Sequence, residues 1–323
     1  MIRFMAGAAE PPHEAYDADV VILSLNRLQE TVAAIGSALD QSGVHKHVTI
    51  LDQGSEPESL AALAALVAGR SEATLLCADR NLGVAGGRNA AAAFGHGRVV
   101  VALDNDAEFA SADTLAGMVA AIDENPSVGA IGCRILNYWS GEDDLTSWGY
   151  PKRLLSRASE SFLATTFVGA GHAIRRTAWQ EAGGYDDSLF FCWEEFDFCL
   201  RAIAYGWEIL YRGDLAVRHK VAPEGRVVWS ATRWFQFVRN RIYIGRKLGV
   251  GWCGLTPRIV GYLIKGLRNG LLRQTVEAIV AAAGMPTGGQ RPASHVLRYL
   301  HDHDRVHRGP ILTRIRTEVL TRL

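Results

Sequence analysis

The sequence predicts an α/β fold in which a mainly parallel, Rossmann-like sheet is flanked by helices. Short runs rich in Val, Ile and Leu alternate with segments of helical periodicity through the first third of the chain, a pattern typical of βαβ units. With 323 residues and 48% apolar composition, the chain can bury one large core or two ordinary ones. In such a sheet the loops that follow the strands meet at one edge and form the ligand crevice.

Each expected strand is a short apolar run that ends in polar residues. After a polar leader at 1–17, strands are expected at 19–24, 48–51, 74–77 and 99–103, with helices at 30–39 and 59–69 and an alanine-rich helix after 89. Residues 134–161 lose periodicity and predict a long functional loop. A strand followed by a helix is expected at 165–179, and another helix at 194–204. The main domain is expected to span 18–225.

The chain has a formal net charge of zero, but its two parts carry opposite charges. Residues 1–225 carry 17 basic and 30 acidic side chains, a balance of −13, whereas residues 226–323 carry 17 and 4, a balance of +13. The basic segment is therefore expected to face an anionic surface, which is the acidic domain itself, a phospholipid or a nucleic acid.

Polar side chains follow four expected strands in succession. Each one alone is typical of a turn or a helix cap, but the repeated pattern indicates a binding site at the edge of the sheet. The residues are Ser24, Asn26 and Arg27 after the first strand, Asp52 after the second, Asn81 after the third, and Asp104, Asn105 and Asp106 after the fourth.

Asp104 and Asp106 are two carboxylates only two positions apart at the end of an apolar strand. They would repel each other unless a cation or a paired donor lies between them. Mg²⁺ and Mn²⁺ take one or two carboxylates together with substrate phosphates. The pair therefore indicates a site for a divalent cation and a diphosphate, although two acids in a turn are also common without one.

The segment at 81–89 places three glycines in five positions ahead of the alanine-rich helix. Glycine lets the backbone approach a ligand closely, and a helix N-terminus favours phosphate. The spacing does not fit a dinucleotide-binding fingerprint. The alternative interpretation is a helix-entry loop whose glycines serve packing.

A third cluster, Glu194, Glu195 and Asp197, lies among aromatic residues, with His219 about twenty positions later. An acid in apolar surroundings has a raised pKa and can act as a general base. The same acids would also suit the first turn of a helix, where they complement its dipole. Both interpretations can hold together.

Taken in order, these motifs resemble glycosyltransferase family 2, whose members have the GT-A fold and invert the anomeric configuration. The resemblance covers about residues 18–250 and is closest to bacterial rhamnosyltransferase-like and galactofuranosyltransferase-like members. It implies that 18–110 binds the nucleotide sugar and 111–225 the acceptor. The motifs are 24–27 (SLNR), 52–55 (DQGS), 81–89 (NLGVAGGRN), 104–106 (DND), 183–186 (GGYD), 193–197 (WEEFD) and His219.

The resemblance also implies roles for individual residues. Asp52 would contact the base, Asp104 the ribose or the metal, and Asp106 would be the principal ligand of Mn²⁺ or Mg²⁺, with His219 as a further ligand. Glu195 matches the catalytic base; many relatives have Asp there, which makes Glu194 a rival, and Asp197 belongs to the same catalytic cluster. Trp193 would offer an apolar face to the acceptor sugar, or else belongs to the core. The expected nucleotide-sugar contacts are Ser24, Asn26, Arg27, Asp52, Asn81, Gly86, Gly87, Arg88, Asn89, Asp104 and Asn105.

The implied activity is metal-dependent transfer of a hexose from a nucleotide-diphosphate sugar, UDP- or dTDP-linked, to a hydroxyl of a glycan or lipid-linked acceptor in bacterial polysaccharide or glycoconjugate synthesis. Two alternatives remain. A nucleotidyltransferase would leave the cluster at 193–197 without a role, and a non-catalytic glycan- or membrane-binding scaffold would not need the full set of carboxylates.

The segment at 226–323 is expected to form basic amphipathic helices. On a helix through 259–271, apolar residues such as Val260 and Leu267 share one face and basic residues such as Arg258 the other. Such helices can lie on an anionic membrane surface, pack on the acidic domain or form a homodimer contact; no nucleic-acid motif is present. With irregularly spaced cysteines and no signal-like or membrane-spanning run, we expect a cytoplasmic protein, peripheral on the inner face of the membrane if the helices bind lipid.

Overall fold

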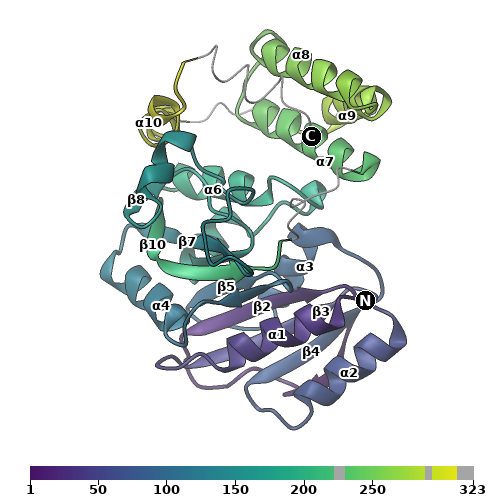
Figure 1. Cartoon of the computed structure of the whole chain (residues 1–323), viewed down its shortest axis with the longest axis vertical. Coiled ribbons are helices and arrows are strands. Elements are labelled where there is room, and N and C mark those ends of the chain that lie inside the picture. Colours follow the sequence, from purple (N-terminus) through teal and green to yellow (C-terminus); the bar gives the residue numbers. More distant parts are fainter. Residues whose placement is uncertain (222–229, 288–292, 311–323) are drawn as a thin grey trace.

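The structure is a computed structural model that describes residues 1–221, 230–287 and 293–310. One ten-stranded sheet runs through the molecule in the order β1-β4-β3-β2-β5-β9-β7-β10-β6, with β8 paired to β10. Helices flank the sheet, and a group of C-terminal helices lies at one end (Figure 1). The predicted α/β fold is confirmed.

The N-terminal half contains the predicted parallel strands. β2, β3, β4 and β5 pair in parallel and are almost wholly buried, because helices cover both faces of this part of the sheet and favour continuous apolar runs. The elements are β2 (Ala18–Ser24), α1 (Leu28–Leu39), β3 (Lys46–Asp52), α2 (Pro57–Val67), β4 (Ala73–Ala78), α3 (Gly83–Ala92) and β5 (Val99–Leu103).

The expected polar leader at 1–17 is partly wrong. Its first residues form β1 (Ile2–Gly7), an edge strand antiparallel to β4. This strand is exposed along most of its length, with Phe4 47% exposed, so it lacks the buried apolar run by which the other strands were found. Gly7 adopts a φ of +86°, and a Cβ there would meet the Ala73 carbonyl.

The second half continues the sheet with strands of mixed direction. β10 pairs in parallel with β7 and antiparallel with β6 and β8, and the β10–β6 pairing sets His219 opposite Ala107. The elements are β6 (Ala107–Phe109), α4 (Thr114–Glu124), β7 (Val128–Asn137), β8 (Ser161–Ala164), β9 (Gly171–Arg175), α5 (Arg176–Ala182), α6 (Glu194–Ala204) and β10 (Glu208–His219), with short 3₁₀ helices at Lys152–Arg157 and Asp187–Leu189.

The glycine-rich segment is not a loop ahead of a helix, because α3 already begins at Gly83. Its glycines allow close packing: a Cβ on Gly83 would lie 2.3 Å from the Phe190 carbonyl oxygen, and one on Gly87 would lie 3.0 Å from both Gln53 and Leu23. The packing interpretation of these glycines therefore accounts for their spacing.

The C-terminal segment is helical, as predicted, and its first helix joins the main domain. Lys247 of α7 pairs with Asp186 at 2.9 Å and with Asp197 at 2.6 Å, and the buried Asn240 donates to the carbonyls of Leu189 and Phe191. Part of the basic charge thus meets the acidic domain. The helices are α7 (Ala231–Lys247), α8 (Trp252–Arg268), α9 (Leu272–Gly284) and α10 (Ser294–His303), followed by a 3₁₀ turn at Arg305–His307.

The predicted helix at 259–271 overlaps α8, which begins earlier, at Trp252, and ends at Arg268. Among the described helices, none combines the length and the apolar composition needed to cross a bilayer.

Candidate active site

A cavity of about 390 Å³ opens at the carboxyl ends of β2, β3 and β5, where the sequence predicted a binding site. Its walls come from four parts of the chain that are far apart in sequence. They are the strand ends (Leu23, Ser24, Leu25, Arg27, Gln53, Asp104, Asn105, Asp106), the entry to α3 (Asn81, Gly83, Val84), the turn before α6 (Phe190, Phe191) and the start of α7 (Thr232, Arg233, Gln236). The last group was not predicted.

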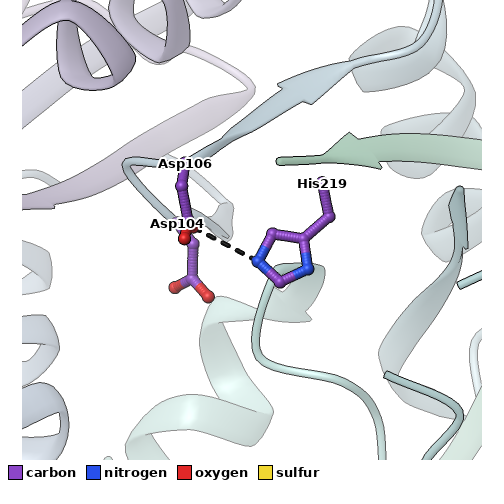
Figure 2. A group of neighbouring side chains, drawn as sticks. All are labelled: Asp104, Asp106 and His219. Carbon is purple, nitrogen blue, oxygen red and sulfur yellow. Dashed lines mark ion pairs between the residues drawn. The ribbon is translucent and has the colours of Figure 1, made fainter. Parts of the chain in front are cut away.

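Asp104, Asp106 and His219 form a cluster at this cavity. One potential ligand atom from each residue lies within 4.8 Å of the others. Figure 2 shows the His219 imidazole, at the end of β10, facing the two carboxylates that follow β5. Two carboxylate oxygens and one imidazole nitrogen form a donor set that fits a divalent cation. The structure therefore brings together the three residues expected to bind metal.

A fourth residue, Asp144, lies behind His219 and was not predicted. It comes from the long segment at 134–161, is 5% exposed, and its Oδ2 lies 3.4 Å from the His219 Nδ1. The other imidazole nitrogen, Nε2, faces Asp106 at 3.3 Å. A carboxylate on the far nitrogen fixes the tautomer and the ring orientation of a histidine ligand. The only sequence signal for it was the loss of periodicity in this segment.

The electrostatics of the cluster favour a cation between the carboxylates. Burial alone would lower the pKa of His219, but hydrogen bonds to Asp106 and Asp144 outweigh it and raise that pKa to about 9. Burial would raise the pKa of Asp106, but His219 and Arg27 lower it to about 2. The imidazolium thus provides positive charge beside the ionised Asp106, whereas burial raises the pKa of Asp104.

This pKa predicts how metal binding depends on pH. Below about 9 the imidazole is protonated, and a metal must displace that proton to gain the nitrogen ligand. Mn²⁺ affinity is therefore expected to rise about tenfold for each unit of increasing pH between 6 and 8, by isothermal titration calorimetry. His219→Gln should bind more weakly and lose this slope. A wild-type affinity independent of pH over this range would contradict His219 as a ligand.

Arg27 also enters the cluster. Its Nη1 lies 2.7 Å from Asp106 Oδ2, and its backbone has a φ of 53°, in the left-handed region that is unusual for a residue with a side chain. Asn26, with a φ of 57°, holds the same turn by accepting a bond from the Glu56 amide. Arg27 lines the cavity, whereas Asn26 supports the turn.

A buried arginine links the cluster to the acidic residues of α6. Arg88 is 4% exposed; it donates to Asp104 at 2.7 Å and to Glu195 at 3.0 Å, and a third bond reaches the Gly169 carbonyl. A carboxylate bound to a buried guanidinium is held in one orientation. Arg88 thus positions Glu195 beside Asp104. The sequence predicted that Arg88 contacts the nucleotide sugar, but its position here is explained by the two carboxylates without such a contact.

Glu194 and Glu195 differ sharply in their surroundings. Glu194 is 3% exposed, and its Oε2 has no hydrogen-bond partner among the described residues. Burial, together with the charge of Glu195, holds the pKa of Glu194 well above its usual range. Glu195 has an ion-paired carboxylate whose side chain is 16% exposed. Of the two, Glu195 has the accessible carboxylate that a general base needs.

Asp197 does not join this group. Its carboxylate is 2% exposed and pairs with Lys247 at 2.6 Å and with Arg201 at 2.9 Å, so it anchors α7 to α6. Both oxygens of Asp197 are thus occupied by cations of α6 and α7, and a catalytic role for Asp197 does not follow from this geometry.

Trp193 also faces α7. Its indole nitrogen donates to the Phe237 carbonyl at 3.1 Å, and the Arg241 guanidinium lies 5.1 Å from its ring centre. It has a φ of 73°, and its neighbour Cys192 has a φ of 71°. Such backbone strain persists only where surrounding contacts hold it, and here it sets the start of α6 and therefore the position of Glu195.

Several expected nucleotide contacts support the cavity from behind. Asp52 is fully buried, and one of its oxygens accepts bonds from the amides of Gly54 and Ser55. It therefore shapes the turn that brings Gln53, which was not predicted, to the cavity wall.

Gly86 and Asn89 lie on another face of α3. They line a second hollow of about 720 Å³. The Asn89 Nδ2 donates to the Tyr185 carbonyl and its Oδ1 accepts from the Tyr185 amide, both at 2.8 Å. Gly87 is packed against Gln53. None of these three residues lines the 390 Å³ cavity, so direct contact with a ligand there does not follow from this arrangement.

Residues 19–183 match the family model of Glycosyl transferase family 2, which spans half of the chain. The chain belongs to glycosyl transferase family 2. It is 29% identical over 167 residues to an uncharacterized protein of Haemophilus influenzae, a match that covers 51% of this chain and 90% of that protein.

Solved structures confirm the fold as GT-A. The mannosyltransferase PcManGT from Pyrobaculum calidifontis, in complex with GDP-Man and Mn²⁺, superposes with a TM-score of 0.54 at 18% identity, over 90% of this chain and 81% of that one. GalNAc-T7 with UDP, GalNAc and Mn²⁺ gives a TM-score of 0.61 at 16% identity over 95% of this chain, which spans 59% of that longer chain. S. aureus TarS, residues 1–349, gives 0.52 at 16% identity over 81% of each chain.

Proposed function

We propose that this family 2 member is a metal-dependent inverting glycosyltransferase that moves a sugar from a nucleotide-diphosphate donor to an acceptor hydroxyl. The proposal is supported mainly by the two ion pairs of Arg88, which hold the carboxylate of Asp104 near the carboxylate of Glu195. A donor held at the cluster would thus present its anomeric carbon near a base.

In the proposed reaction Glu195 accepts the proton of the acceptor hydroxyl. The oxygen forms its bond to the anomeric carbon from the face opposite the leaving group, and the bond to the nucleoside diphosphate breaks, so the configuration inverts. A divalent cation, when bound by Asp104, Asp106 and His219, neutralises negative charge on the leaving diphosphate. Burial raises the pKa of the neighbouring Glu194, which disfavours a second negative charge beside the base.

The donor set favours Mn²⁺ over Mg²⁺. Mg²⁺ takes mainly oxygen ligands and keeps several waters, whereas an imidazole suits the later transition metals better. Two similar folds, PcManGT and GalNAc-T7, were solved with Mn²⁺, one with a GDP-linked and the other with a UDP nucleotide. For this chain we propose UDP- or dTDP-hexose donors, with rhamnosyl- or galactofuranosyl-type transfer in bacterial polysaccharide or glycoconjugate synthesis.

The proposal is tested with a panel of UDP-, dTDP- and GDP-sugars in the presence of Mn²⁺. We expect metal-dependent release of the nucleoside diphosphate from at least one donor, measured by a coupled assay and abolished by EDTA. Release of pyrophosphate would identify a nucleotidyltransferase instead. Binding of donor with no turnover, with or without simple glycan acceptors, would favour a non-catalytic scaffold.

We propose further that the outer face of α8 and α9 binds an anionic membrane surface and brings the enzyme to lipid-linked acceptors. Apolar side chains stand exposed along it at helical spacing, among them Leu267 at 65% and Val280 at 66%, and basic residues such as Arg268 and Arg273 lie on the same pair of helices. Exposed apolar faces with basic flanks are typical of helices that lie in the membrane interface.

The membrane contact predicts co-sedimentation with vesicles of phosphatidylglycerol and phosphatidylcholine, weakened by salt. Leu267→Glu together with Val280→Glu should abolish it without changing donor turnover in solution. Equal sedimentation of variant and wild type would refute the contact. If the variant instead converts a dimer to a monomer by analytical ultracentrifugation, the face is a homodimer interface. A truncation before α7 is unsuitable, because α7 forms part of the cavity wall.

A further inference from the structure

The start of α7 closes the donor cavity from a part of the chain outside the region matched by the family model. Thr232, Arg233 and Gln236 line the cavity together with Asp104 and Asp106, although they lie well beyond residue 183, where the family match ends. In Figure 1, α7 lies between the sheet domain and α8. A C-terminal helix therefore shapes a cavity whose other walls are strand ends and loops of the main domain.

The charge of the cavity leaves one arginine without an acidic partner. Two cations line it: Arg27 pairs with Asp106 and Glu30, whereas Arg233 has no ion pair with any carboxylate in the described part of the chain. The Arg233 guanidinium lies 5.7 Å from the ring centre of Phe191, another lining residue. It is solvent-exposed, so its charge is available to a ligand.

Unsatisfied polar atoms point to a ligand in the same cavity. Ser24 is fully buried, and its hydroxyl has no partner among the described residues. The buried Oε1 of Gln236 is also unpartnered within the described ranges. Buried polar groups are almost always hydrogen-bonded, and both residues line this cavity. A rotation of either side chain toward the cavity would let a polar molecule bound there satisfy its oxygen.

Charge balance identifies the part of the ligand that meets Arg233. A divalent cation held by Asp104 and Asp106 would share its charge between these carboxylates and the ligand, so the two ionised phosphates of a nucleotide sugar would be only partly compensated. A metal bound at Asp106 would also compete with Arg27 for that carboxylate and free its guanidinium. Arg27 and Arg233 would then supply two positive charges, and arginine is well suited to phosphate because it donates several hydrogen bonds from a planar group.

We propose that α7 supplies a phosphate-binding wall to the donor cavity, in which Arg233 contacts the diphosphate of the nucleotide sugar. This inference rests on the proposed function and adds a binding residue to it. Thr232, next to Arg233, adds a hydroxyl donor on the same turn, and the Gln236 side chain lies one turn further along the helix.

The test compares nucleotide binding by Arg233→Gln and wild type in the presence of Mn²⁺, using UDP, GDP and the corresponding monophosphates. Calorimetry should show diphosphate affinity reduced about tenfold or more in the variant, with a smaller loss for the monophosphates. Arg298→Gln is the matched control: it removes the same charge from α10, where Arg298 is exposed, and should bind nucleotides as wild type does. Arg233→Lys should recover part of the lost affinity.

The possible outcomes separate this inference from the proposed function. Wild-type affinity for UDP and GDP in Arg233→Gln would overturn the inference alone. Failure of the wild type to bind any nucleoside diphosphate would overturn both. Equal thermal unfolding of the two variants and wild type shows that a loss of affinity in Arg233→Gln does not come from misfolding.

Discussion

Glu195→Gln is expected to lower the rate of sugar transfer by roughly 10²- to 10⁴-fold, the contribution typical of a general base. Glutamine has the same shape, and its amide oxygen can still accept from Arg88, but it cannot take up the acceptor proton. Donor affinity should change little, because the Asp104 and Asp106 carboxylates remain in place. The measurement pairs the transfer rate with the affinity for UDP or GDP in the presence of Mn²⁺.

Glu194→Gln is the matched control for this prediction. Glu194 lies one position away, and burial raises its pKa and so favours its neutral form. An isosteric neutral residue should therefore leave the transfer rate within a few fold of wild type. The assignment would be reversed if Glu194→Gln were inactive while Glu195→Gln kept its activity. A large loss of donor affinity in Glu195→Gln would instead indicate a binding role.

Asp106→Asn is expected to weaken Mn²⁺ binding by at least about 100-fold and to lower transfer to a similar or greater extent. The Asp106 carboxylate contacts both His219 and Arg27. An amide is a poorer metal ligand than a carboxylate, and it no longer stabilises the protonated imidazole of the metal-free protein. Electron paramagnetic resonance of free Mn²⁺ measures the first effect directly.

Asp113→Asn is the control for charge loss. Asp113 is exposed at the start of α4 and bonds only Ser111 among the described side chains. It should bind Mn²⁺ with wild-type affinity. If Asp106→Asn also bound Mn²⁺ normally, the metal would lie elsewhere, and the roles given to Asp104 and His219 would fall with it.

The parts of the fold that sequence could predict are those with a strong local pattern. β2 to β5 are continuous apolar runs because helices bury both faces, and the polar residues after them meet at one edge for topological reasons. β1 has no such pattern because it is an exposed edge strand. The twelve residues of β10 alternate between buried and partly exposed positions and include charged residues, which conceals a long strand.

The residues of the site likewise include some that the sequence predicted and others that it could not predict. Asp104, Asp106, Glu195 and His219 belong to recognisable motifs, and the structure brings them to one place. Asp144 could not be predicted, because it lies in an irregular segment and meets His219 only through the tertiary fold.

The basic charge of the C-terminal segment gave no sign that α7 would line the donor cavity. The two ends of α7 make different contacts. Lys247, near the C-terminal end, pairs with carboxylates of the acidic domain, whereas Arg233, near the N-terminal end, lines the cavity. Only the arrangement in space separates those two roles.

The central claim is that the cluster of Asp104, Asp106 and His219 holds the metal that binds the donor diphosphate. The most direct test is the anomalous scattering of Mn²⁺ in a crystal grown with Mn²⁺ and UDP or GDP. We predict a single strong peak within coordination distance of these three side chains, with the diphosphate on the side facing Arg233. A peak away from all three residues, or a nucleotide bound outside the 390 Å³ cavity, would contradict the claim.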